Sequence, residues 1–121
     1  MDVFISKIYT KNLTTIKQSL KLISMQLTKN ETKIADIFTA LGDKTRLKLY
    51  RILLNEKEIC VSSMADVVGI SPAGTSQHLK ILEKTGLIKR NRYGQKVCYK
   101  INENNEIAHS INKIVKGKTN E

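Results

Sequence analysis

The sequence has no tryptophan, a single proline and only two cysteines in 121 residues. Aromatic residues make up 5% of the chain, so the core must be mainly aliphatic, which favours packed helices over a large β-sandwich. Two cysteines are too few for a disulfide framework. No apolar run approaches the ~20 residues that span a bilayer, and the N-terminus lacks the pattern of a secretory signal. We therefore expect a cytoplasmic protein whose cysteines serve as thiols, ligands or sensors.

Catalytic patterns are also missing from the sequence. It contains no acid pair, no Ser-His-Asp arrangement, no phosphate-binding loop and no zinc motif. The only two histidines are His78 and His109. The sequence therefore predicts that the chain is not an enzyme.

Positive charge is abundant. The chain has 21 lysines and arginines against 11 acidic residues, a formal net charge of +10. A basic surface attracts polyanions, and nucleic acid is the commonest soluble one. A charge excess that serves only solubility is the alternative, so the charge alone does not decide the function.

Hydrophobic periodicity predicts a mostly helical chain with one small hairpin. The expected elements, in order, are helices over 12–28, 32–41 and 44–55, a short strand over 58–60, helices over 64–69 and 72–84, strands over 87–92 and 95–101, and a helix over 105–117. Asp43 can cap the third helix, and Ser62 or Ser63 can cap the fourth. This order predicts a mainly α fold with a β-hairpin wing, a winged helix-turn-helix. The apolar stripes of the two terminal helices predict that the protein is dimeric, because self-association through a two-fold interface would bury them.

The sharpest local signal is Ser71-Pro72, because serine caps a helix and proline fits its first turn. Thr75, Leu79 and Leu82 then mark the inner face of helix 72–84. The outer face can enter a major groove, where Gln77 can pair with an adenine edge. The expected DNA contacts of this segment are Ser71, Ala73, Gly74, Ser76, Gln77, His78 and Lys80.

The hairpin that follows is strongly basic. Six lysines and arginines and no acidic residue lie between Lys84 and Lys100. Such a hairpin can lie along the phosphate backbone or in the minor groove, and a solvated ribbon is the alternative reading. The expected contacts in the wing are Arg90, Arg92, Tyr93, Gln95 and Lys96.

Residues 34–101 resemble the ArsR/SmtB family of metal- and stress-sensing repressors. The resemblance rests on ALGDKTRLKLYRILL and on EICVSSMADVVGISPAGTSQHLKILEKTGLIKRNRYGQKVCYKI. It implies a homodimer that binds double-stranded operator DNA and releases it when an inducer binds. It also implies a division into an N-terminal dimerisation helix over 1–30, a DNA-binding domain over 31–101, and a C-terminal dimerisation helix with a frayed tail over 102–121.

The inducer is less defined. Thiol-based metal sensors of the family read E-L-C-V-C-D-L-A, whereas this chain has Cys60 followed by Ser62 in place of the second cysteine. Cadmium, lead and arsenite favour two or three thiolates, so Cys60 alone does not complete such a site. Glu106 and His109 lie three residues apart on the predicted last helix, where they could hold a metal ion together. The alternative interpretation is that both side chains simply lie on a solvated helix face.

A thiol pair is another possibility for the sensor. In winged-helix folds the short strand pairs with the second wing strand, which would bring Cys60 near Cys98. The pair could then serve as a redox switch or bind a thiophilic metal ion. The alternative is that both cysteines act only as small, half-buried apolar side chains. A regulator without an effector, an activator and a protein-interaction module also remain open.

Overall fold

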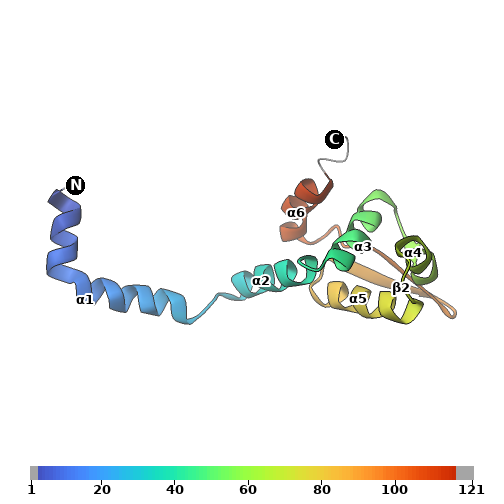
Figure 1. The fold of residues 1–121 in the computed structure, drawn as a ribbon, viewed down its shortest axis with the longest axis horizontal. Helices are drawn as coiled ribbons and strands as arrows, with labels where there is room; N and C mark the ends of the chain where they lie inside the picture. Colours follow the sequence, from blue (N-terminus) through green and yellow to red (C-terminus); the bar gives the residue numbers. More distant parts are fainter. Residues whose placement is uncertain (1–2, 117–121) are drawn as a thin grey trace. The chain divides into compact units, whose positions relative to one another are not determined.

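The computed structural model describes residues 3–116, with side chains described from residue 14 onward (Figure 1). It forms two compact units, residues 1–32 and residues 33–121. Between residues 3 and 116 no helix combines the length and the apolar character that a membrane crossing requires. The elements are α1 (Val3–Met25), α2 (Lys29–Leu41), α3 (Lys44–Asn55), β1 (Ile59–Cys60), α4 (Val61–Val68), α5 (Pro72–Lys84), β2 (Ile88–Tyr93), β3 (Lys96–Ile101) and α6 (Glu106–Lys116).

The order of elements agrees with the sequence prediction, but the boundary between the first two helices differs. Hydrophobic periodicity predicts that the first helix ends at residue 28 and that the second begins at residue 32. In the structure α1 ends at Met25 and α2 begins at Lys29. Thr28 Oγ1 accepts a hydrogen bond from the Glu31 amide at 3.1 Å, and Glu31 Oε1 accepts one from the Thr28 amide at 2.9 Å. This capping box fixes the start of α2.

The second unit is built around a core of leucine, isoleucine and two tyrosines. Its buried side chains come from α2, α3, α4, α5, both wing strands and α6. Asp43 caps α3 as predicted, because Asp43 Oδ1 accepts from the Arg46 amide at 3.0 Å. The contacts of α5 with α3, α4 and β2 place the predicted reading helix against the rest of the helix-turn-helix.

The fourth helix begins earlier than the sequence predicted, and neither Ser62 nor Ser63 is its cap. Its N-cap residue is Cys60, which makes no side-chain capping bond, and the helix starts at Val61. Strand pairing explains this start. Cys60 is held in an extended conformation by β1, so the chain turns directly from strand into helix. The two serines consequently lie exposed in the first turn of α4.

The three strands form an antiparallel sheet in the order β1-β3-β2. The prediction that the short strand pairs with the second wing strand is confirmed, with Ile59 opposite Tyr99 and Cys60 opposite Cys98. In the hairpin, Arg90 lies opposite Tyr99 and Arg92 opposite Val97. The turn between β2 and β3 is centred on Gly94, whose φ of 63° is in the left-handed region that glycine tolerates.

Two buried tyrosines in this core differ in how their hydroxyl groups are satisfied. The Tyr50 hydroxyl donates to Asn112 Oδ1 on α6, and burial raises the pKa of Tyr50 to about 12. The Tyr99 hydroxyl is buried without a hydrogen-bond partner among the described residues, and burial raises its pKa as well.

We predict opposite effects of removing these two hydroxyl groups. Tyr99→Phe should raise the free energy of unfolding by about 1 kcal/mol, because it removes an unsatisfied buried donor. Tyr50→Phe should lower it by about 1 kcal/mol, because it leaves Asn112 without its partner. Urea unfolding of both variants beside the unmodified protein measures the two changes. A loss of stability in Tyr99→Phe equal to that in Tyr50→Phe would show that the Tyr99 hydroxyl is bonded.

Candidate nucleic-acid interface

The start of α5 is built by the predicted serine cap. Ser71 is extended, with φ −64° and ψ 151°, and its Oγ accepts from the Gly74 amide at 3.0 Å. Pro72 occupies the first turn, where it removes no helical hydrogen bond. A Cβ on Gly74 would lie 3.1 Å from Ser71 Oγ, so the glycine leaves room for the cap. Sequence and structure therefore agree on how this helix begins.

The two faces of α5 divide as the sequence predicted. Thr75, Leu79 and Leu82 are fully buried against the core. Among the expected contacts, Ser71, Ala73, Gln77 and Lys80 are exposed, whereas Gly74, Ser76 and His78 are half-buried. Small side chains at the N-terminal end and a polar outer face suit close approach to a major groove.

His78 is tied to the start of α3. Arg46 Nη1 lies 3.2 Å from His78 Nδ1, and Arg46 Nε donates to the Ala40 carbonyl at 2.7 Å. Arginine is only a donor, so Nδ1 accepts this bond and a neutral His78 ring carries its proton on Nε2. The Arg46 amide lowers the pKa of Asp43 at the same junction. Arg46 thus positions α5 relative to α3, a role that its sequence context does not reveal.

The wing places two arginines on the side of the hairpin that faces α5. Successive strand residues point to opposite faces, so Arg90 and Arg92 share a face with the buried Ile88. Arg90 Nε lies 3.8 Å from Glu83 Oε2 of α5. Arg92 Nε donates to the Gly94 carbonyl at 2.9 Å across the turn. The remaining expected wing contacts, Tyr93, Gln95 and Lys96, are also exposed.

The other face of the wing is held by Glu58, a residue that no sequence pattern marks as functional. Glu58 Oε2 accepts from Asn91 Nδ2 at 2.7 Å, and Glu58 Oε1 accepts from the Tyr93 hydroxyl at 2.9 Å. These bonds, from Asn91 first and Tyr93 second, lower the pKa of Glu58. The bond to Glu58 also raises the pKa of Tyr93. We call this arrangement of Glu58, Asn91 and Tyr93 the Glu58 bridge.

The Glu58 bridge predicts a specific pH dependence. Because folding lowers the pKa of Glu58 below its ordinary 4.5, the bridge stabilises the fold above that pH and is lost as the pH falls through the folded value. Denaturant unfolding of the unmodified protein and of Glu58→Gln at pH 6 and near pH 3 measures this contribution. We expect the unmodified protein to be the more stable at pH 6 and the difference to shrink in acid. A difference independent of pH would contradict an ionised bridge.

Cys60 and Cys98 are joined by a disulfide between β1 and β3, and their Cα atoms are 3.7 Å apart. Cys98 is 1% exposed, whereas Cys60 is half-buried at the start of α4. The described residues contain no cluster of three or more His, Cys, Asp and Glu side chains with metal-ligand geometry. In the tail, His109 Nε2 lies 2.9 Å from the Glu103 carbonyl.

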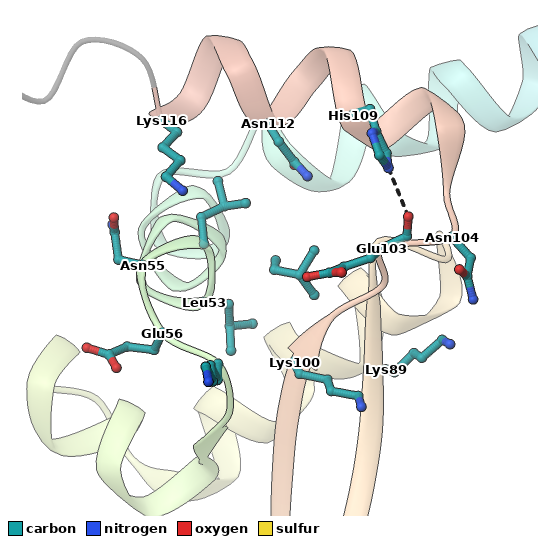
Figure 2. Close-up of a pocket in the computed structure, with 13 residues that line it drawn as sticks. Leu53, Asn55, Glu56, Lys89, Lys100, Glu103, Asn104, His109, Asn112 and Lys116 are labelled. Atoms are coloured by element: carbon teal, nitrogen blue, oxygen red, sulfur yellow. Dashed lines mark hydrogen bonds between the residues drawn. The ribbon is translucent and has the colours of Figure 1, made fainter.

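A groove of about 710 Å³ lies between the end of α3, the base of the wing and α6 (Figure 2). Figure 2 shows side chains from all three elements around it, among them Glu56, Lys89, Lys100, His109 and Asn112. None of the residues expected to contact DNA lines this groove. The groove and the outer face of α5 are therefore separate surfaces.

Comparison with known proteins identifies related sequences. A family model described as "Bacterial regulatory protein, arsR family" matches residues 43–90. A cadmium resistance transcriptional regulatory protein CadC homolog of Staphylococcus aureus is 35% identical over 74 residues, which are 61% of each chain. This chain thus spans about three fifths of that relative. An uncharacterised HTH-type transcriptional regulator of Methanocaldococcus jannaschii is 37% identical over 62 residues, 51% of this chain and 70% of that protein.

A solved structure shows the same architecture. It is a homodimeric winged helix-turn-helix DNA-binding domain of Mycobacterium bovis, described as a possible ArsR-family transcriptional regulator. The TM-score is 0.61 at 23% identity, and the alignment covers 76% of this chain and 85% of that chain. At this identity the likeness concerns the fold alone, and it confirms the predicted winged helix-turn-helix.

Proposed function

The chain belongs to the ArsR family of transcriptional regulators, and from this premise we propose that it is a dimeric repressor that binds double-stranded operator DNA. The family is a class of regulators, in agreement with the expectation that the chain is not an enzyme. In this proposal α5 enters the major groove and reads bases, while the wing lies along the neighbouring phosphates.

One observation carries the proposal. The outer face of α5 and the two wing arginines lie on the same side of the sheet, and the Arg90 to Glu83 contact joins them. A helix with small and polar outward side chains is thereby flanked by a cationic strand, on a chain whose net charge is +10. In that arrangement α5 would read the bases, and the wing would neutralise the phosphates, of the same stretch of duplex.

Dimerisation is supported by apolar side chains that the described residues leave uncovered. In the first unit, Leu22 and Ile23 of α1 are exposed. In the second unit, Phe38 of α2 is 63% exposed and Ile114 of α6 is 77% exposed. Self-association through a two-fold axis would bury such side chains. We therefore propose that residues 1–30 and 102–121 contribute to the dimer and residues 31–101 to DNA binding.

The names of several relatives refer to cadmium or arsenic resistance, which raises the question of a metal inducer. The only cysteines of this chain are Cys60 and Cys98, and the structure joins them by a disulfide. They lie together, but no third His, Cys, Asp or Glu of the described residues completes a site with them. One chain therefore does not supply the three thiolates of a three-thiolate site for cadmium or arsenite.

Protection mapping tests the proposed function directly. Purified protein is incubated with the DNA upstream of its own coding region, and cleavage is compared with and without protein. We expect protection of an inverted repeat whose half-sites are about 34–36 Å apart, as two recognition helices of a dimer require. Uniform weak protection that disappears at moderate salt would indicate only nonspecific charge attraction and would overturn the proposal. Sizing at micromolar concentration supplies the second readout, because a monomer would contradict the dimer.

A further inference from the structure

We propose that the groove between the end of α3, the base of the wing and α6 binds a small phosphorylated polyhydroxy compound, of the sugar phosphate class. The groove encloses about 710 Å³, within the ~300–1,000 Å³ of ordinary small-molecule sites. It is lined by none of the residues expected to contact DNA. The proposal concerns binding alone, so it stands whether or not the chain represses transcription.

The charge of the groove is positive. Two glutamates, Glu56 and Glu103, and four lysines line it. The lysines are Lys57, Lys89, Lys100 and Lys116. The only ion pair among the described residues joins Arg90 to Glu83, so no carboxylate of those residues neutralises any of the four lysines at close range. A bound anion would therefore meet cationic groups that the fold itself leaves without a close partner.

Two of these lysines lie directly opposite each other in the wing. Lys89 pairs with Lys100 in the register of β2 with β3, and both side chains are exposed at one side of the groove (Figure 2). Like charges in directly opposed positions destabilise an antiparallel pair of strands. Glu58 attracts Lys100 through its charge, but its two oxygens are held by the Glu58 bridge. A phosphate monoester, with about two negative charges and three strong acceptor oxygens, would join the two lysines and remove their repulsion.

Asn112 contributes an oriented pair of hydrogen-bond donors. Its Oδ1 accepts from the Tyr50 hydroxyl, and Tyr50 is buried in the core. With that oxygen turned to Tyr50, the Nδ2 group and its two N–H bonds are left for the groove that Asn112 lines. One turn further along α6, Lys116 points to the same groove (Figure 2). The amide and the ammonium group both suit the acceptor oxygens of a phosphate.

The remaining polar lining suits hydroxyl groups. Glu56 and Glu103 offer acceptor oxygens. The amides of Asn55 and Asn104 both donate and accept. No phenylalanine or tyrosine of the described residues lines the groove, and the His109 ring is bonded to the Glu103 carbonyl at 2.9 Å. A nucleobase would therefore lack the aromatic platform on which bases stack, so a compact compound with several hydroxyl groups and one phosphate fits better than a nucleotide.

A dimer formed through α6 would leave the groove open. Ile114 is the exposed apolar residue of α6 that the proposed dimer buries. It lies five positions after His109 and two before Lys116. At about 3.6 residues per turn, these separations place Ile114 on the other side of the helix from the groove. The groove residues all belong to the second unit, residues 33–121, so one chain supplies the whole site.

Binding is measured first with the unmodified protein, by isothermal titration calorimetry at constant ionic strength. The probes are glycerol 3-phosphate, ribose 5-phosphate and glucose 6-phosphate. We expect at least one of them to bind at one site per chain with a dissociation constant below about 1 mM. Inorganic phosphate and the unphosphorylated compounds should bind at least ~10-fold more weakly, because each lacks part of the contact set. Absence of saturable binding for all three probes, or equal binding of inorganic phosphate, would overturn the proposal.

Two variants locate the site. Lys89→Gln with Lys100→Gln removes the opposed charges, and Asn112→Asp keeps an acceptor for Tyr50 while it replaces the two donors by a carboxylate oxygen. Each variant should weaken binding of the tightest probe at least ~10-fold. Thermal unfolding checks that both variants fold. The double lysine variant should unfold at an equal or higher temperature than the unmodified protein, because the repulsion between like charges is gone.

The matched control changes two lysines outside the groove. Lys44→Gln with Lys48→Gln removes the same charge from the exposed side of α3 and should bind the probe like the unmodified protein. Equal losses in the two double variants would assign binding to total charge and overturn the site. A variant of Lys89 and Lys100 that keeps probe binding but loses DNA affinity would make the two lysines nucleic-acid contacts and would overturn the proposal as well.

Discussion

Replacing Arg90 and Arg92 together by alanine is expected to weaken DNA binding by about 100-fold near 0.1 M salt, on specific and nonspecific sequences alike. Both side chains are exposed on the hairpin face that α5 shares. A dimer would lose four phosphate contacts, so the slope of log K against log salt should fall by roughly 3 to 4. Arg90 makes only an exposed 3.8 Å pair with Glu83, which a phosphate can replace at little cost. Fluorescence anisotropy over a salt series measures both quantities.

The matched control removes the same charge from another surface. Lys48 and Arg51 are exposed on α3 and belong to neither proposed contact region. Lys48→Ala with Arg51→Ala should change affinity far less than the wing variant and leave the salt slope nearly unchanged. Equal losses in the two double variants would mean that total charge, rather than the wing, attracts DNA.

The second large effect is expected at Gln77. A bidentate contact between glutamine and adenine contributes about 1–3 kcal/mol of discrimination, so Gln77→Ala should reduce preference for the operator about 10- to 100-fold in each half-site. Binding to unrelated DNA should change little, because Gln77 is uncharged and exposed on the outer face of α5. Competition between operator and unrelated duplexes measures this preference, as the ratio of the two dissociation constants.

Lys80 on the same helix is the contrasting variant. Its exposed side chain would contact phosphate, so Lys80→Ala should weaken binding to all sequences by a similar factor. A Gln77→Ala protein that keeps full sequence preference would place base reading elsewhere on the chain.

The features that the sequence predicted well depend on local patterns. Ser71-Pro72 carries its own capping chemistry, and the side chains of Thr75, Leu79 and Leu82 recur on one helix face. The capping box of Thr28 and Glu31 was equally readable, since threonine and glutamate stand three residues apart before an apolar stretch. Apolar periodicity alone predicts that α2 starts at residue 32, three residues later than its observed start at Lys29.

The features that the sequence did not reveal depend on residues far apart in the chain. Glu58 meets Asn91 and Tyr93 across 33 and 35 positions, and Arg46 meets His78 across 32. No local pattern marks such partners, because only the folded sheet and helix packing bring them together. The proximity of Cys60 and Cys98 can be predicted only because the winged-helix topology specifies which strands are neighbours.

The most direct test of the account is a nitrogen-15 NMR titration of the protein with operator duplex, which follows the backbone amide of each residue. If α5 and the wing bind one duplex together, the largest shift changes should fall within residues 71–80 and 90–96. Changes concentrated in α6 and along the groove at the end of α3, with those two segments unaffected, would contradict it.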